Sequence, residues 1–273
     1  LELVKPDGRP LTLYSRRPIP PVERAPSPNA EPVPANPHLR WHPLRGEWVA
    51  YAAHRQTRTF LPPPEYNPLR PSVDAAHPTE LPAGDYDVAV FDNLFPSLSL
   101  AARDPPALGI PTEPARGRCE VVVFTQDPQA SLANLPLDHV DLLLRVWADR
   151  TRRHADSGVL RYTLPFENRG VEVGVTLHHP HGQIYSYPFV PPVPARMNER
   201  EREHHASTGR VLLADLLAAE LEDGCRVLYA GPHAAAFLPP WARYPYEVWV
   251  APRRPVPYLG DLDAGERLDL ARA

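Results

Sequence analysis

Three side chains that can do chemistry are spaced two residues apart near the middle of the chain: His179, His181 and Gln183. Side chains two apart share a face of a β-strand, so a strand here presents two imidazoles and a carboxamide together. A neutral imidazole is a nucleophile near pH 7 that can attack phosphorus. A glutamine amide donates to a phosphoryl oxygen without gaining or losing a proton. The pattern predicts phosphoryl or nucleotidyl transfer through a histidine adduct.

A glycine-rich segment leads into these side chains. The chain reads Phe-Glu-Asn-Arg-Gly over 166–170, then Gly174, and then His-Pro-His-Gly-Gln over 179–183. Glycines let backbone N–H groups come close to a charged phosphate. A surface strand that happens to carry histidines is the alternative interpretation, but it leaves the asparagine, the glycines and the glutamine unexplained.

This stretch resembles the galactose-1-phosphate uridylyltransferases, a family of the histidine-triad superfamily. Hydrolases of that superfamily carry a third histidine where the transferases have glutamine, and this chain has Gln183. The resemblance implies that His181 attacks the α-phosphorus of UDP-glucose and that galactose 1-phosphate then takes the uridylyl group, a double displacement of galactose metabolism. It implies that His179 orients the nucleophile. Gln183 would stabilise charge on the non-bridging oxygens.

The resemblance extends to substrate-binding positions. Arg55 and Arg58 match two arginines that reach the nucleotide diphosphate from the neighbouring subunit, and guanidinium suits phosphate because it is always charged and bidentate. Phe91, Asn93 and Phe95 match residues around the uracil and ribose, although the two aromatic rings fit a buried core equally well. Three further residues match family positions that surround the ribose and phosphates: Asn168, Gly174 and Thr176.

One family feature is missing from this chain. Many members have a tetrahedral zinc site whose first two ligands come from a Cys-Pro-Leu-Cys segment, where this chain has Asn67 and Arg70. Pro128 stands at the third ligand position, and only His179 remains of the four. We therefore expect no metal and no other cofactor, and a loop held by packing and hydrogen bonds.

The elements around the motif predict an α+β fold. Residues 118–125 read as an apolar strand, 135–155 as a helix with an apolar stripe, and 159–166 as the strand that leads to the motif. With the motif strand, this order is that of one histidine-triad unit, an antiparallel sheet with a covering helix. Apolar strands and helices after residue 210 suggest a second, degenerate copy of this unit. The copy is incomplete here, and the resemblance implies that family members continue with a further segment that completes it.

These patterns divide the chain into three parts. Residues 1–37 hold an Asp7-Gly8 hairpin signal and a proline-rich extended linker. Residues 38–190 form the first histidine-triad-like repeat, which carries the nucleophile, and residues 191–273 form the second, truncated repeat.

Composition narrows the class of protein. A chain of 273 residues that is 43% hydrophobic can bury a sizeable core. A net charge of −4 gives no electrostatic footprint for nucleic acid, and no apolar run reaches the length of a membrane span. Cys119 and Cys225 form no paired motif, so we expect a cytoplasmic protein. The resemblance further implies a homodimer that binds UDP-glucose and galactose 1-phosphate.

Two other functions fit the same residues. A nucleotide phosphorylase or adenylyltransferase would use the same histidine chemistry and would differ in base preference near Phe91 and Phe95. A nucleotide-binding protein without activity is the other alternative, because the zinc ligands are lost and the second repeat is incomplete.

Overall fold

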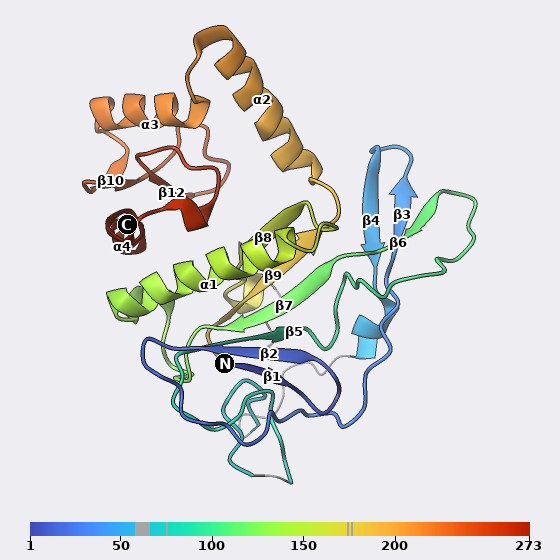
Figure 1. The fold of residues 1–273 in the computed structure, drawn as a ribbon. Coiled ribbons are helices and arrows are strands. Elements are labelled where there is room, and N and C mark those ends of the chain that lie inside the picture. Colours follow the sequence, from blue (N-terminus) through green and yellow to red (C-terminus); the bar gives the residue numbers. More distant parts are fainter. Residues whose placement is uncertain (58–65, 75, 174, 176) are drawn as a thin grey trace. The chain divides into compact units, whose positions relative to one another are not determined.

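The computed structural model describes residues 1–57, 66–74, 76–173, 175 and 177–273 (Figure 1). The chain divides into a first unit, residues 1–135 with 153–189, and a second unit, residues 136–152 with 190–273. Helices and antiparallel sheets occur together, which confirms the α+β class. The three-part division at residues 37 and 190 stays a prediction. Within the described part of the chain, no helix combines the length and hydrophobicity needed to cross a bilayer.

The first unit is built on a six-stranded antiparallel sheet in the order β1-β2-β5-β7-β9-β8. Its strands are β1 (Glu2–Val4), β2 (Pro10–Tyr14), β5 (Val88–Asp92), β7 (Arg118–Val123), β8 (Tyr162–Phe166) and β9 (His181–Tyr187). Along β9, half-buried residues at 181, 183, 185 and 187 alternate with fully buried residues at 182, 184 and 186. This period of two gives β9 two faces. We call the face of residues 181, 183, 185 and 187 the cavity face, because a cavity described below opens on it, and the face of residues 182, 184 and 186 the core face.

The N-terminal hairpin is part of this sheet. Gly8 takes the positive φ of 82° that the turn between β1 and β2 requires, and β2 pairs with β5, which confirms the predicted hairpin. The proline-rich residues 18–37 contain no helix or strand, yet Ala25 lies in the core and Ser27 Oγ donates to Asp7 Oδ2 at 2.5 Å. The predicted linker is therefore packed against the sheet.

A second, three-stranded sheet in the first unit has the order β4-β3-β6 (Figure 1). Its strands are β3 (His38–His42), β4 (Glu47–Tyr51) and β6 (Thr112–Pro114). The rings of Trp41 and Trp48 meet edge to face at 5.3 Å, and the Arg40 guanidinium lies 3.8 Å from the Tyr51 ring centroid. After β4, the chain enters the short helix η1 (Ala53–Thr57), which carries Arg55.

A buried polar cluster ties three strands together on the core face of β9. Ser186 Oγ lies 2.6 Å from His154 Nδ1 and 2.9 Å from Thr163 Oγ1, which belongs to β8. His154 Nε2 lies 3.1 Å from a carboxylate oxygen of Glu120 on β7. A slip of β9 by one residue would turn His181 to the core face and bring Tyr185 or Tyr187 to the place of Ser186, among side chains that are at most 1% exposed. The cluster thus favours the register that leaves His181 on the cavity face.

The second unit holds most of the helices. They are α1 (Leu137–Ala155, whose last turn belongs to the first unit), α2 (Pro192–Thr208), α3 (Leu212–Asp223) and α4 (Ala264–Arg272). Its sheet has the order β10-β11-β12, formed by Val227–Ala230, Ala234–Phe237 and Trp249–Pro252. Among the short helices of the described residues, η4 (Leu259–Asp261) belongs to this unit, whereas η2 (Leu132–Asn134) and η3 (Val171–Val173) belong to the first.

Local signals in the sequence set the ends of these helices. Gly224 ends α3 in the left-handed conformation, with φ of 73°, as its position predicts. Asp263 begins α4 and forms a reciprocal capping box with Glu266. Inside the unit, the buried Asp269 of α4 accepts from Tyr229 Oη at 2.5 Å and from the N–H of Ala234 at 2.8 Å.

Candidate active site

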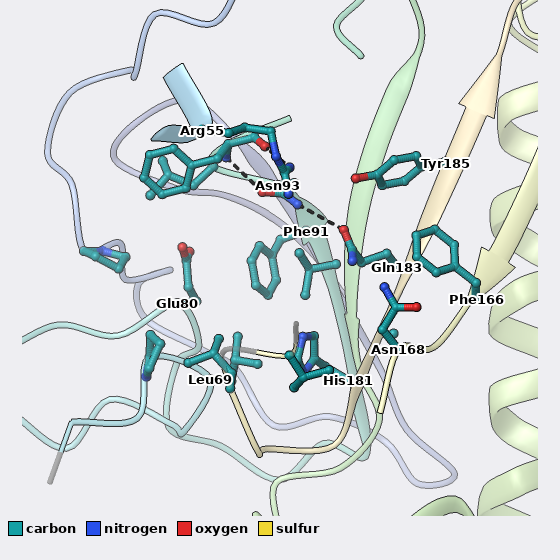
Figure 2. Close-up of a pocket in the computed structure, with 18 of the residues that line it drawn as sticks. Arg55, Leu69, Glu80, Phe91, Asn93, Phe166, Asn168, His181, Gln183 and Tyr185 are labelled. Carbon is teal, nitrogen blue, oxygen red and sulfur yellow. Dashed lines mark hydrogen bonds between the residues drawn. The ribbon is translucent and has the colours of Figure 1, made fainter. Parts of the chain in front are cut away.

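A cavity of about 450 Å³ opens on the cavity face of β9, within the size range of small-molecule sites. Figure 2 shows His181, Gln183 and Asn168 on one side of it, with Leu69 and Glu80 opposite. All of its lining residues belong to the first unit, and most lie on β5, β7, β8, β9 and η1 or in the loops before and after β5 and after β8. The predicted site residues that line it are Arg55, Phe91, Asn93, Phe95, Asn168, His181 and Gln183.

His181 presents an unprotonated ring nitrogen to this cavity. Its Nδ1 lies 2.7 Å from the backbone oxygen of His179. A carbonyl only accepts, so Nδ1 carries the proton and Nε2 keeps its lone pair. Burial lowers the pKa of His181 below its usual 6.5, against the opposing effect of the hydrogen bond to His179. The ring is therefore a neutral base at physiological pH.

His179 lies behind the nucleophile and does not line the cavity. The motif alternation predicted that it would share a face with His181, but β9 begins only at His181. Pro180 accepts from the N–H of Phe124 at 3.1 Å but has no N–H to donate in return, so the regular ladder ends there. His179 is instead 3% exposed, with Nε2 at 2.7 Å from the oxygen of Thr125 and Nδ1 at 3.0 Å from Asn67 Nδ2. Burial lowers its pKa as well.

Asn93 determines which end of the Gln183 amide is available. Asn93 Oδ1 accepts from the N–H of Phe95 at 2.8 Å, so its NH₂ group points the other way. That group donates to Gln183 Oε1 at 3.3 Å, a bond drawn in Figure 2. Since the Gln183 oxygen is occupied, its NH₂ is the end that can donate to a ligand beside His181.

Arg55 lines the cavity of its own chain. Its Nη1 donates to the carbonyl oxygen of Phe95 at 2.6 Å, which holds the guanidinium next to the turn after β5 (Figure 2). The resemblance implied that this arginine reaches the neighbouring subunit, whereas here it borders the cavity that holds His181. The matching Arg58 lies outside the described residues, and so do Gly174 and Thr176.

Phe91 lies next to a buried ionic cluster at the cavity wall. Lys5 Nζ lies 4.5 Å from the centroid of its ring. Glu80, which lines the cavity, pairs with both Lys5 and Arg9, and Arg9 also pairs with Asp7. Burial lowers the pKa of Lys5 to about 8, despite the attraction of Glu80. The N-terminal hairpin thus supplies charged groups behind this wall of the cavity.

Sequence reasoning missed several residues of the cavity. Glu80 and Tyr66 come from a proline-rich loop without a recognisable motif, and Lys5 lies 75 residues from its partner Glu80. Phe166 and Tyr185, whose rings meet edge to face at 5.1 Å, complete the wall near Asn168. These two residues could have been predicted, because the sequence indicated both strands and placed Tyr185 on the same face as His181 and Gln183.

The loop around Asn67 does not offer a zinc site. A carboxamide, a guanidinium and a proline stand at three of the four positions, and none of these is a ligand that zinc takes in proteins. The fourth residue, His179, already uses both ring nitrogens. Among the described residues, no three His, Cys, Asp or Glu side chains are grouped so that they could hold a metal ion. The residues present do not fit the metal.

Sequence comparisons place this arrangement among known proteins. Residues 29–191 match the family model described as galactose-1-phosphate uridyl transferase, N-terminal domain. A galactose-1-phosphate uridylyltransferase of Streptomyces lividans is 38% identical over 269 residues, which cover 97% of this chain and 70% of that protein. Its counterpart in Thermotoga maritima is 35% identical over 240 residues, 86% of this chain and 72% of that protein.

Solved structures agree with this relationship. A uridylyltransferase structure superposes with a TM-score of 0.74 at 30% identity, over 86% of this chain and 72% of that one. An ADP-glucose phosphorylase from Arabidopsis thaliana shares the fold, with a TM-score of 0.59 at 21% identity over 86% of this chain and 74% of that one. The family match covers more than half of the chain and includes His181 and Gln183, and two relatives exceed 30% identity over most of their length. This chain belongs to the galactose-1-phosphate uridyl transferase family.

Proposed function

We propose that this chain transfers a uridylyl group from UDP-glucose to galactose 1-phosphate through a covalent uridylyl-histidine at His181. The relatives from Streptomyces lividans and Thermotoga maritima carry the name of this activity. The observation that carries the proposal is the 2.7 Å contact between His181 Nδ1 and the His179 carbonyl oxygen, because a carbonyl accepts only, so the proton is on Nδ1 and Nε2 remains a base at the cavity.

The first step makes one bond and breaks one. His181 Nε2 attacks the α-phosphorus, a P–N bond forms, and the P–O bond to the sugar phosphate breaks, so that glucose 1-phosphate leaves with the electron pair. The ring becomes cationic as it attacks, and the His179 carbonyl stabilises the Nδ1–H that carries this charge.

The second step reverses the chemistry with another acceptor. A phosphate oxygen of galactose 1-phosphate attacks the same phosphorus, the P–N bond breaks, and the electron pair returns to Nε2. In both steps the NH₂ of Gln183, oriented by Asn93, donates to a non-bridging oxygen as its negative charge grows. Arg55 supplies a fixed positive charge for the diphosphate.

Three finer points belong to the same proposal. Phe91 and Phe95 would contact the base, and Asn168 the ribose or phosphates, which their positions in the cavity wall support. A cytoplasmic location is supported by two free cysteines, Cys119 and Cys225. A homodimer is supported by the resemblance alone, and light scattering coupled to size-exclusion chromatography tests it.

Intact-mass measurement tests the proposed function directly. We expect the chain to gain one uridylyl group when it is incubated with UDP-glucose and to lose it on addition of galactose 1-phosphate. His181→Gly should gain none, whereas the control His77→Gly, on an exposed loop, should behave as the wild type. An adduct formed from ADP-glucose but not from UDP-glucose would favour an adenylyl-transferring phosphorylase instead. Tight UDP-glucose binding without any adduct would favour a binding protein.

A further inference from the structure

The hydrogen bonds of His179 fix its protonation state. Nδ1 faces the amide nitrogen of Asn67, which can only donate, and Nε2 faces the carbonyl of Thr125, which can only accept. The ring is therefore neutral, with its proton on Nε2 and its Nδ1 lone pair bound by the Asn67 amide. Because His179 is 3% exposed, water does not compete for either bond.

The orientation of the Asn67 amide is determined locally. Its Oδ1 accepts from the N–H of Leu69 at 3.0 Å, so the NH₂ end must face His179. The loop that follows is anchored, since the N–H of Ser72 donates to the oxygen of Leu81 at 2.8 Å and Leu69 is 3% exposed. Asn67 is thus held as a donor at this position.

The two hydrogen bonds that hold the His179 ring affect the nucleophile through one backbone group, the carbonyl of His179. His179 is held from one side by Asn67 and from the other by Thr125, and its own carbonyl accepts the Nδ1–H of His181 at 2.7 Å. Moving the His179 ring would therefore move the acceptor that fixes the tautomer and the direction of His181.

We propose that Asn67 is a positioning residue whose amide N–H replaces a metal ion at His179 Nδ1, so that the alignment of His181 needs no metal. The inference deepens the proposed function and depends on it for the role of His181. A zinc ion at this place would have to take the same Nδ1 lone pair that the amide already binds, and Arg70 and Pro128 add no ligand.

The first experiment needs no nucleotide. In the purified wild-type chain, we expect side-chain nitrogen NMR to give a protonated Nε2 and an accepting Nδ1 for His179, and elemental analysis to find far less than one zinc per chain. Asn67→Asp keeps the size of the side chain but replaces the donor with an acceptor, so Nδ1 of His179 should become protonated. A wild-type His179 with a protonated Nδ1, or one zinc ion per chain, would overturn the proposal.

The second experiment measures the rate of uridylyl adduct formation. Asn67→Ala should slow it about 10- to 100-fold, as loss of a hydrogen bond that orients a ligand or nucleophile commonly does. The KM for UDP-glucose should change by less than about twofold, because Asn67 does not line the cavity. Treatment of the wild type with a zinc chelator, or addition of zinc chloride, should leave the rate unchanged.

A matched control separates positioning from general stability. Asn36 is an exposed asparagine that likewise donates to a carbonyl and accepts from an N–H, both of Arg103, so Asn36→Ala removes a similar pair of bonds away from the cavity. It should leave the adduct rate unchanged. A normal rate in Asn67→Ala, or a rate lost on chelation, would refute the proposal. If Asn67→Ala does not fold, the wild-type tautomer and zinc content still decide it, and a wild type that forms no adduct refutes the proposed function instead.

Discussion

Gly182 stands between His181 and Gln183, and the structure leaves no room for a side chain there. A Cβ at this position would lie 2.7 Å from Phe124 Cζ and 2.7 Å from the carbonyl oxygen of Phe166. Phe124 is 1% exposed, and Phe166 pairs with Gln183 across β8 and β9, so neither neighbour can move freely. Overpacking of this kind costs about 1–3 kcal/mol. We therefore expect Gly182→Ala to destabilise the first unit by about that amount.

Thermal unfolding measures this cost. Each kcal/mol corresponds to about 2–4 °C in Tm for a unit of this size. Relief of the strain by a shift of β9 would also displace His181, and a displacement of about 1 Å can slow the adduct-forming step about 100-fold. The control is Gly109→Ala, where a Cβ meets nothing within 4 Å, so stability and rate should stay as in the wild type.

A second substitution tests the cause of the effect. Phe124→Leu removes the ring atom nearest the new Cβ, so the double variant should be more stable than the sum of the two single effects predicts. Two results would show that the close packing under β9 does not constrain the nucleophile. One is a Gly182→Ala protein with the Tm of the wild type, and the other is a double variant whose loss of stability equals the sum of the two single losses.

Three further expectations follow from the same geometry. Because burial lowers the pKa of His181, the midpoint at which the adduct rate falls with decreasing pH should lie below 6.5; a midpoint above 6.5 would contradict this. Arg55→Lys should raise the KM for UDP-glucose about tenfold, whereas Arg45→Lys, on an exposed turn, should not; equal KM values would remove Arg55 from the diphosphate site. Asp269→Ala leaves the buried N–H of Ala234 without its acceptor and should cost the second unit about 1–3 kcal/mol in urea unfolding; an unchanged midpoint would contradict the buried network.

The motif and its strand could be predicted because short-range rules decide them. Alternation placed Gln183 on the face of His181, and the expected strands 118–125 and 159–166 pair with β9 on either side. The Asp7-Gly8 turn is likewise a property of a few neighbouring residues. These predictions needed no knowledge of the tertiary fold.

The remaining features depend on contacts that are distant in sequence. His179 left the predicted face because Pro180 stops the ladder, and its partner Asn67 lies 112 residues away. The buried ionic cluster next to Phe91 pairs Lys5 with Glu80, which is 75 residues away. No local sequence pattern around either residue predicts this ion pair. A pattern of spacing reports the face of a strand but not what fills the space behind it.

The N-terminal hairpin also determines which strand lies at one edge of the first unit's six-stranded sheet. Strand β2 covers the outer side of β5, whose residues 88–91 are all buried and apolar. A chain that started after Tyr14 would expose an open row of N–H and C=O groups along one of its most apolar strands, the kind of border that recruits strands from other molecules. Residues 2–14 therefore pair with this side of β5 and leave the three-residue strand β1 at the edge of the sheet.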